Sequence, residues 1–256
     1  MRKILNICPI GEDPLVESQV KLYLEKFCRS DTEIEVRSLG KAPMDLEYLF
    51  HETLIAVDML RLVKVAEKEG FDAAIVGCFY DPYLDAAKEI CEKMVIVGPG
   101  EASLHFAATL SNRFSIIAPS KKTVPHMWGT VKKNRFTEYL ASVHSLDVPV
   151  VDLLDNPTLI YDKMCQEIEV AISKYHAEAI ILGCTLELGH FFDLQNKYGL
   201  PIIDVSLAAL KYAECLIDLR EAFGWYTSKI GEFSSPPFEN LKKWGLEDKY
   251  GMKGLF

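Results

Sequence analysis

Residues 71–78 read FDAAIVGC, and residues 177–184, which begin 106 positions later, read AEAIILGC. Each stretch is a short apolar run without polar alternation, and each ends in glycine and cysteine. Such runs are typical of strands buried on both faces, as in a parallel sheet that is covered by helices. The recurrence of the strand together with its Gly-Cys ending predicts two similar halves in one chain.

The repeat extends to both sides of these two strands. Residues 94–98, with a helical pattern after them, correspond to residues 200–204, and 106 positions again separate Val95 from Pro201. The opening strand, residues 4–7, corresponds to residues 115–118. The chain therefore repeats a whole arrangement of strands and helices.

We expect an α/β fold of two similar lobes, each a parallel sheet flanked by helices, related by a pseudo-twofold axis. Lobe 1 comprises residues 1–98 and 206–256, and lobe 2 comprises residues 99–205. Ligands of open α/β sheets bind beyond the carboxyl ends of the strands, so we expect the active site in the cleft between the lobes. Residues 225–256 show little periodicity, and we expect this tail to pack over lobe 1 or over a partner subunit.

Short β-branched runs alternate with longer amphipathic stretches along the chain, which is typical of parallel sheets covered by helices. The expected strands are residues 4–8, 34–36, 73–76, 95–97, 114–118, 150–151, 179–182 and 202–203. The expected helices are residues 15–28, 54–69, 82–93, 102–110, 124–133, 158–175, 188–197 and 207–223.

Composition excludes several classes of protein. The chain has 256 residues, of which 49% are hydrophobic and 25% charged, so it has ample material for a folded core. Its 28 basic and 37 acidic residues give a net charge of −9. An acidic chain without a basic run is a poor ligand for nucleic acid or an anionic membrane, so we expect neither partner. No apolar window is long enough to span a membrane.

The seven cysteines are scattered along the chain, and no two form a CxxC pair. This arrangement suits reduced thiols better than a disulfide scaffold or a zinc knuckle, so we expect a cytoplasmic protein. The six histidines show neither HxH nor HExxH spacing, so we expect no metal site. Residues 1–9 begin like a signal peptide, but Asn6 interrupts a short apolar part, so we interpret them as the first strand.

Cys78 and Cys184 are the candidate catalytic residues, because each follows a predicted buried strand. Asp81-Pro82 after Cys78 is typical of a helix N-cap with proline at the first helical position. Thr185 after Cys184 is expected to cap the next helix in the same way. A thiol ahead of a helix amino terminus is favoured as thiolate. Two acid–base groups on opposite faces of one carbon can exchange its proton with inversion.

The alternative is that a cysteine after a strand is simply a small buried apolar residue. Its recurrence at matching positions favours the functional interpretation for Cys78 and Cys184. Core packing on helix faces explains Cys28, Cys91, Cys165 and Cys215. For Cys8, at a strand end, both pocket lining and core packing stay open. We expect Glu101 and Glu187 to open helices, where the helix dipole explains them.

The chain resembles the aspartate/glutamate/hydantoin racemase superfamily, most closely its hydantoin and allantoin racemase branch. Residues 78–82, CFYDP, are similar to the Cys-Phe-x-Asp-Pro segment of that branch, and residues 84–89 are similar to the helix after it. The resemblance runs from the first strand to about Phe223. Further segments that fit the branch are residues 98–102, 113–115, 123–125 and 147–150.

The resemblance implies a racemase that needs no cofactor and inverts a stereocentre next to a carbonyl. One cysteine would act as thiolate base and the other as thiol acid on the opposite face, and on this chain these are Cys78 and Cys184. The resemblance also leads us to expect a homo-oligomer and a small-molecule substrate, hydantoin-like or allantoin-like. The carbanion needs donors aimed at the enolate oxygen. The candidate substrate-binding residues are Pro9, Ile10, Phe79, Tyr80, Ser120 and Thr185.

Three departures from the pattern bear on the substrate. Amino-acid racemases of the superfamily usually place Asn-Thr where this chain has Phe79-Tyr80, which favours a more apolar substrate such as a cyclic amide. The hydantoin branch usually has Asn-Pro-Asn-Thr after the first strand, where residues 6–10 read NICPI. Residues 183–188, GCTLEL, look more like the amino-acid racemase version. The alternatives are therefore an amino-acid racemase, a decarboxylase or cis–trans isomerase of the superfamily, and a binding protein on the same scaffold.

Overall fold

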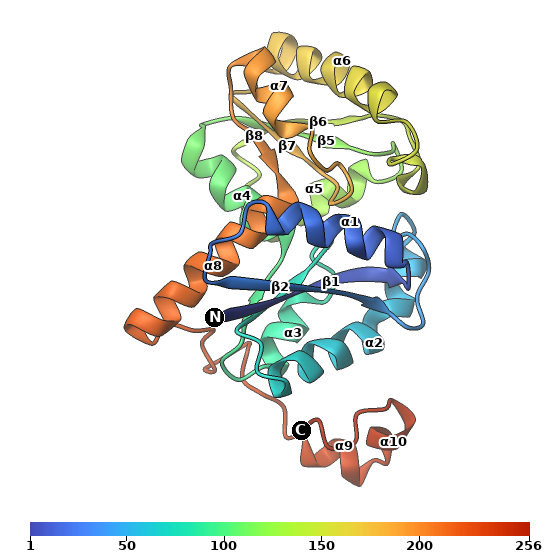
Figure 1. Ribbon diagram of the computed structural model, residues 1–256, viewed down its shortest axis with the longest axis vertical. Helices are drawn as coiled ribbons and strands as arrows, with labels where there is room; N and C mark the ends of the chain where they lie inside the picture. Colours follow the sequence, from blue (N-terminus) through green and yellow to red (C-terminus); the bar gives the residue numbers. More distant parts are fainter. The chain divides into compact units, whose positions relative to one another are not determined.

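The protein, whose residues 1–256 are all described by a computed structural model, divides into two compact units (Figure 1). The first unit consists of Met1–Val76, Pro82–Val97 and Lys211–Phe256. The second unit consists of Gly77–Asp81 and Gly98–Leu210. Each unit holds one four-stranded parallel sheet flanked by helices, which confirms the predicted fold class.

The units differ from the expected lobes at two short segments and one further residue. Residues 77–81, residues 206–210 and Gly98 belong to the second unit, whereas the sequence placed them in the first lobe. Hydrogen bonds explain the first difference, because Gly77 accepts one from Thr185 and Asp81 accepts two from the start of the helix that follows Gly98. The segment that carries Cys78 is therefore part of the second unit.

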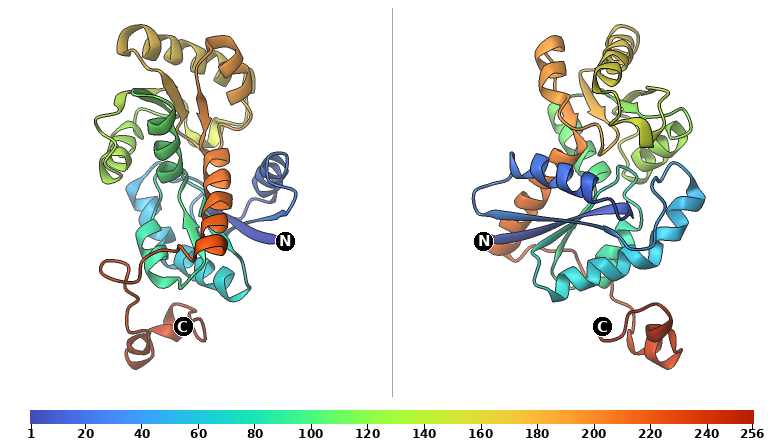
Figure 2. Two further views of the ribbon diagram at one scale, coloured as in Figure 1. Left: turned by 90° about the vertical axis from the view of Figure 1, so that its left-hand side faces the viewer. Right: turned by 45° about the vertical axis from the view of Figure 1, so that its right-hand side comes forward.

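The first sheet has the strand order β2-β1-β3-β4. Its strands are β1 (Arg2–Gly11), β2 (Thr32–Leu39), β3 (Ala73–Val76) and β4 (Val95–Val97). Its helices are α1 (Pro14–Glu25), α2 (Leu49–Lys68) and α3 (Leu84–Ile90). Figures 1 and 2 show α1 on one face of this sheet and α2 with α3 on the other. All of β3 and β4 is buried, as expected for apolar strands covered on both faces.

The second sheet repeats this order as β6-β5-β7-β8. Its strands are β5 (Phe114–Ala118), β6 (Leu140–Ser145), β7 (Ala179–Leu182) and β8 (Ile202–Asp204). The helices α4 (Pro99–Leu110) and α5 (Val124–Lys133) contact each other and the sheet, and α6 (Pro157–Tyr175) and α7 (Phe191–Tyr198) lie on its other face (Figure 1). The two sheets therefore share one topology.

The internal repeat extends to the strand register. Ala74 of β3 lies opposite Ile96, and 106 residues later Ile180 lies opposite Ile202. The paired strands of the two sheets thus match residue for residue at the spacing found in the sequence.

The opening strands match with a shift of one residue from the prediction. Ile4 lies opposite Ala73 and Phe114 lies opposite Ala179, so Ile4 corresponds to Phe114 and the predicted match to Ser115 is wrong. Successive strand residues point to opposite faces, so a shift of one residue exchanges the faces. The apolar runs do not fix the register because both of their faces are buried.

The strand predicted at residues 150–151 is wrong. Val150–Asp152 forms a short 3-10 helix after Pro149, and the edge strand is β6, which pairs with β5. Sequence reasoning missed β6 because it lacks a continuous apolar run and carries serine and histidine.

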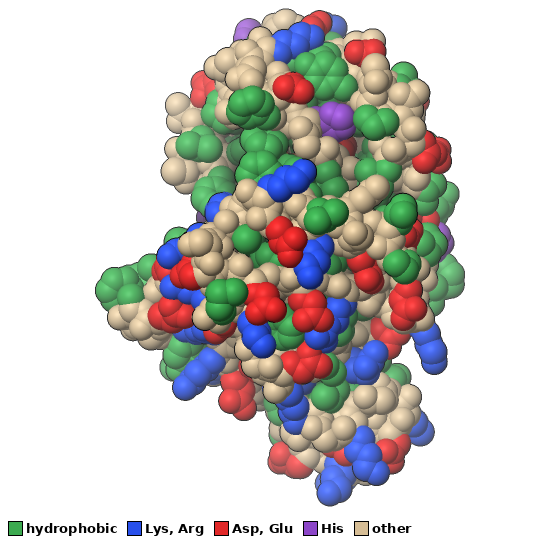
Figure 3. Space-filling model, viewed as in Figure 1, with side chains coloured by type: hydrophobic (Ala, Val, Ile, Leu, Met, Phe, Trp, Pro, Cys, Tyr) green, Lys and Arg blue, Asp and Glu red, His purple; other side chains and the backbone are tan.

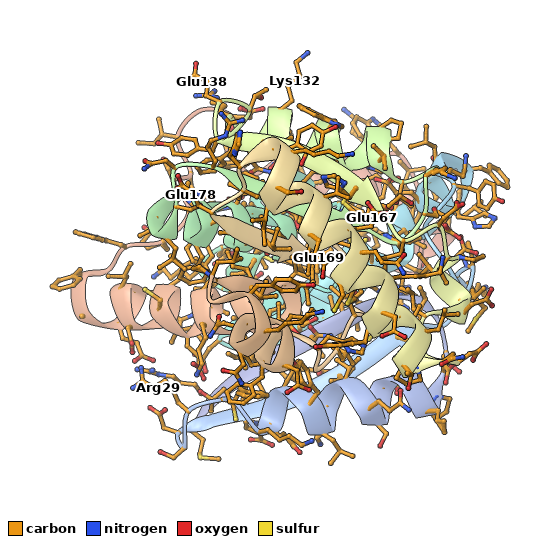
Figure 4. The ribbon with its side chains drawn as sticks, turned by 90° about the horizontal axis from the view of Figure 1, so that it is seen from above. Arg29, Lys132, Glu138, Glu167, Glu169 and Glu178 are labelled. Atoms are coloured by element: carbon orange, nitrogen blue, oxygen red, sulfur yellow. The ribbon has the colours of Figure 1, made fainter.

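The polar side chains of β6 are satisfied by one another and by α6. Ser142 Oγ lies 2.7 Å from Ser115 Oγ and 2.7 Å from His144 Nε2. His144 Nδ1 lies 3.1 Å from a carboxylate oxygen of Glu167 on α6, which Figure 4 labels. This chain of hydrogen bonds explains why a polar strand can lie at the edge of a buried sheet.

The tail beyond α8 (Val205–Phe223) belongs to the first unit, which is one of the two positions expected for it. It carries the short helices α9 (Glu239–Lys243) and α10 (Leu246–Lys249). The stacked rings of Phe238 and Phe256 lie 5.8 and 5.5 Å from the buried ammonium of Lys64 on α2. Lys229 Nζ donates to the carbonyls of Lys88 and Glu89 at the end of α3. Rings and hydrogen bonds together hold the tail to α2 and α3.

Charged side chains of both signs are interspersed on the face shown in Figure 3. Many of them form ion pairs, as where Arg2 of β1 contacts Asp218 at 2.6 Å and Glu221 at 2.7 Å, both on α8. None of the helices is both long enough and apolar enough to cross a bilayer.

Candidate active site

Cys78 lies in a tight turn two residues beyond the end of β3, and its side chain is half-buried. The backbone N–H of Asp81 donates to the carbonyl of Cys78 at 3.0 Å and closes the turn. Asp81 has a φ of 51°, a left-handed conformation that aspartate adopts more readily than most residues. The thiol is therefore placed by a backbone turn.

Asp81 caps a different helix from the one the sequence predicts. Its carboxylate, 2% exposed, accepts from the N–H of Gly100 at 2.9 Å and of Glu101 at 2.6 Å, at the start of α4. The prediction that Asp81 caps the next helix is wrong, because α3 begins only at Leu84, after Tyr83 in a left-handed conformation. A carboxylate at the amino end of α4 is favoured by two N–H donors and by the helix dipole.

Two glycines let the backbone of the Cys78 turn touch α4. A Cβ atom on Gly100 would lie 2.2 Å from the carbonyl oxygen of Phe79, and one on Gly98 would lie 2.2 Å from Asp81 Oδ1. Both distances are far below van der Waals contact. The start of α4, from Gly98 to Gly100, is therefore the surface against which the Cys78 turn packs.

Replacing Asp81 by alanine should lower the free energy of unfolding by about 2 kcal/mol, because two buried N–H groups lose their acceptor. Alanine also tolerates the left-handed conformation poorly. Asp81→Asn keeps one acceptor oxygen and a residue that tolerates this conformation, so it should lose less. Urea unfolding of the three proteins measures both differences, and an alanine variant as stable as the wild type would contradict this account of the cap.

Phe79 and Tyr80, both predicted to bind substrate, belong to the second unit, and both side chains are buried. Phe79 is 2% exposed, and the Tyr80 ring stacks on the His126 ring of α5 at 3.8 Å with 6° between the planes. Burial lowers the pKa of His126, so its ring favours the neutral form. Sequence reasoning assigned no role to His126, and nothing in its local pattern points to the stack.

Cys184 lies two residues beyond β7 in a second turn and is also half-buried. The N–H of Gly183 donates to the carbonyl of Ile117 at 2.8 Å, and a Cβ on Gly183 would lie 2.7 Å from that oxygen. Glycine is thus required where β7 ends against β5. The N–H of Glu187 donates to the carbonyl of Cys184 at 3.1 Å, and this hydrogen bond closes the turn.

Thr185 joins the two cysteine turns. Its hydroxyl donates to the carbonyl of Gly77 at 3.1 Å, and its own carbonyl accepts from the hydroxyl of Ser206 at 3.3 Å. The prediction that Thr185 caps the next helix is wrong, because α7 begins only at Phe191. Gly77 precedes Cys78 and Thr185 follows Cys184, so one hydrogen bond links the residues beside the two cysteines.

Glu187 is a buried acid near Cys184. The prediction that Glu187 opens a helix is wrong, because no helix begins at this residue. One carboxylate oxygen accepts from the N–H of Cys184 at 3.3 Å, and Oε1 is buried without a hydrogen-bond partner. Burial raises the pKa of Glu187 well above its usual value, and the charge of Asp204 raises it further, while the Cys184 N–H acts in the opposite direction. The sequence signal was only an acid three residues after the cysteine.

The remaining predicted binding residues lie in both units. Ser120, in the second unit, follows β5, and its carbonyl accepts from the hydroxyl of Thr123 at 2.7 Å. Pro9 and Ile10 belong to the first unit, and the end of the first strand that was expected at residue 8 is wrong, because β1 continues to Gly11. They form a bulge in the pairing with β2, where the missing N–H of proline costs no ladder hydrogen bond. No group of three or more His, Cys, Asp or Glu side chains is placed to hold a metal ion.

The other cysteines differ in exposure. Cys91 and Cys165 are buried as predicted, Cys28 is half-buried, and Cys215 is exposed, so its predicted core packing is wrong. The buried face of α8 runs instead through Ala209, Ala213 and Ile217. Cys8 is buried at 7% exposure.

Alkylation should separate these thiols. Burial raises the pKa of Cys8 and of Cys91 to about 12, with a smaller contribution from Glu17 and Glu67 respectively. Since the thiolate is the reacting form, iodoacetamide near pH ~8 should leave both unlabelled in the folded protein and should label the exposed Cys215. Peptide mass spectrometry reads the result, with protein in urea as the control. Labelling of Cys8 as fast as Cys215 would overturn the assignment of Cys8 to the core.

Comparison with known proteins gives concordant results. The model of the Asp/Glu/Hydantoin racemase family matches residues 16–213. A hydantoin racemase of Rhizobium meliloti is 32% identical over 205 residues, 80% of this chain and 83% of that protein. A hydantoin racemase of Paenarthrobacter aurescens is 30% identical over 235 residues, 91% of this chain and 97% of that protein. The structure of an allantoin racemase from Klebsiella pneumoniae matches with a TM-score of 0.85 and 26% identity, over 94% of this chain and 99% of that one.

Proposed function

The chain belongs to the aspartate/glutamate/hydantoin racemase family, and from this premise we propose that it is a cofactor-independent racemase with Cys78 and Cys184 as its two acid–base residues. It inverts a stereocentre next to a carbonyl in a hydantoin-like or allantoin-like compound. The names of its relatives support this substrate class, since they are hydantoin racemases and an allantoin racemase.

The observation that carries the proposal is the hydrogen bond from Thr185 Oγ1 to the Gly77 carbonyl. It joins the residue after Cys184 to the residue before Cys78 within one compact unit. Both cysteines are half-buried, so neither thiol is enclosed in the core. Two acid–base residues that serve one carbon need this combination of proximity and access.

In the reaction one cysteine, as thiolate, takes the proton from the stereocentre, so that an S–H bond forms and the C–H bond breaks. The electron pair left on carbon is delocalised onto the neighbouring carbonyl oxygen as an enolate. The other cysteine, as thiol, delivers its proton to the opposite face, and the carbonyl forms again. The product has the inverted configuration, and the two cysteines have exchanged protonation states.

The enolate oxygen needs hydrogen-bond donors in place before charge develops on it. We assign this role to the backbone amides of Phe79, Tyr80 and Thr185. The hydroxyl of Thr185 donates to Gly77, so the amide is the donor that Thr185 still offers to a substrate. An uncharged cyclic amide suits these donors and the apolar Phe79-Tyr80 pair better than a charged amino acid does.

The test is one enantiomer of a 5-substituted hydantoin incubated with the protein in deuterated water. Optical rotation should fall to zero while the C5 proton signal disappears from the NMR spectrum, because inversion takes its proton from solvent. A sample without protein measures spontaneous racemisation. Optical stability across a set of hydantoins, allantoin and amino acids would refute the proposed function.

A further inference from the structure

One helix of the second unit, α5, contacts both cysteine turns. The ring of His126 lies flat on the ring of Tyr80, with 3.8 Å between the centroids and 6° between the planes, and Tyr80 is the third of the four residues in the Cys78 turn. The next residue of α5, Met127, lies against the other turn. A Cβ atom on Gly183, just before that turn, would lie 3.1 Å from the Cε atom of Met127. Two neighbouring side chains of α5 therefore contact residues beside the two cysteines.

The geometry of a helix explains how one turn of α5 reaches two places. Successive side chains point about 100° apart around the axis, so His126 and Met127 face different neighbours. Residues four apart share a face, so Thr130 lies on the same face as His126. A Cβ atom on Gly100 would lie 3.0 Å from the Cγ2 atom of Thr130, so this face also contacts the start of α4. The helix α5 thus supports the Cys78 turn both directly and through α4.

These contacts are enclosed, and α5 is itself anchored to the second sheet. Tyr80 is 9% exposed and Met127 is 1% exposed. The hydroxyl of Thr123, ahead of α5, donates to the carbonyl of Ser120 just beyond β5, and the carbonyl of Thr123 accepts from the N–H of Met127 at 3.0 Å. The strand β5 pairs with β7, which leads to the second cysteine turn. Both contacts and their anchor therefore belong to one compact unit.

Resting on the proposed function, we propose that the start of α5, residues 126–130, is a brace that fixes the two cysteine turns, with His126 and Met127 as positioning residues of the racemase. His126 acts through Tyr80 on one turn, and Met127 acts through Gly183 on the other. Proton transfer depends steeply on the distance between the thiol and the stereocentre, and a displacement of about 1 Å lowers the rate by about a hundredfold.

The stack decides which substitutions of His126 are tolerated. His126→Phe keeps a flat ring that stacks on Tyr80 and removes both nitrogens, so it should retain the wild-type kcat and the wild-type pH profile of racemisation. His126→Ala removes the ring and should lower kcat by about tenfold or more with little change in KM, because the loss falls on the position of the reacting groups. A role of the imidazole in proton transfer would instead make the phenylalanine variant as damaging as the alanine variant.

The experiment that tests the brace without requiring racemisation measures how fast iodoacetamide alkylates each cysteine in the full-length protein. Tryptic peptides 69–88 and 175–197 each contain a single cysteine, Cys78 and Cys184 respectively, so mass spectrometry follows both thiols in one sample. Loss of the stack lets one turn open more often, so His126→Ala should raise the alkylation rate of Cys78 by about fivefold and leave that of Cys184 unchanged. Trp128→Ala is the matched control, because it removes an exposed ring from the same helix and should change neither rate.

Met127→Leu is the reciprocal variant. Leucine nearly conserves the volume but withdraws the end of the side chain from Gly183, so alkylation of Cys184 should rise and that of Cys78 should not. A general loosening of the second unit would raise both rates to the same extent in each variant. Such equal rises, or an unchanged rate at Cys78 in folded His126→Ala, would overturn the proposal. A wild type without racemase activity would refute the proposed function, and the alkylation rates would decide separately whether α5 holds the two turns.

Discussion

Cys78→Ala and Cys184→Ala are each expected to lower the rate of racemisation by about a thousandfold or more, because inversion needs a proton donor and a proton acceptor on opposite faces of one carbon. The remaining cysteine can still remove a proton from its own face and return a deuteron to the same face. Each variant should therefore exchange the C5 proton of one enantiomer with solvent and leave its configuration unchanged. The two variants should act on opposite enantiomers.

The measurement is proton NMR together with polarimetry, with both enantiomers of one hydantoin and each variant in deuterated water. Cys215→Ala is the control for the loss of a thiol, since this cysteine is exposed on α8 in the first unit and the variant should keep full activity. Full racemisation by Cys78→Ala would eliminate the two-cysteine mechanism. Equal exchange of both enantiomers by one single variant would also contradict it.

Gly100→Ala should be the most damaging single methyl addition in the chain. The new Cβ would lie 2.2 Å from the carbonyl oxygen of Phe79, so the Cys78 turn or the start of α4 must move. Overpacking against rigid backbone is expected to cost about 3 kcal/mol in the free energy of unfolding. Displacement of the turn by about 1 Å should lower the racemisation rate by about a hundredfold, because proton transfer depends on the position of the thiol.

Gly129→Ala supplies the matched control for this substitution. Gly129 lies inside α5, and a Cβ there would have nothing within 4 Å. Alanine in a helix interior is preferred over glycine by about 0.5–1 kcal/mol, so this variant should be slightly more stable and fully active. Thermal unfolding and initial rates compare the two proteins. A Gly100→Ala variant as stable and active as Gly129→Ala would show that the close contact is not rigid.

Four strands could be predicted to the residue because burial on both faces leaves an uninterrupted apolar run. The ranges expected for β3, β4, β5 and β7 are the observed ones. The edge strand β6 could not be predicted, because its serine and histidine side chains are satisfied by Ser115 and Glu167, which are distant in sequence. A pattern of hydrophobicity records burial, and it carries no information about hydrogen-bond partners elsewhere in the chain.

The same limit applies to the candidate site. The sequence located both Gly-Cys turns, because the strand before each one is apolar and the spacing repeats. It misassigned Asp81, whose carboxylate caps a helix 19 residues further along, and Thr185, whose hydroxyl reaches Gly77, 108 residues back. Local rules pair a capping residue with the next helix, whereas here tertiary contacts supply closer donors and acceptors. Glu187 is inconspicuous in sequence because its burial depends on the assembled second unit.

The division of the chain into units has a consequence for the order of folding. The first unit is completed only by Lys211–Phe256, which the ribosome delivers after the residues of the second unit. The long stretch of the second unit, Gly98–Leu210, leaves the ribosome earlier. Domains generally fold as units as soon as their residues are available. We therefore expect the second unit to acquire its structure first in the nascent polypeptide, while the strands of the first unit, although synthesised before Gly98–Leu210, wait for Lys211–Phe256.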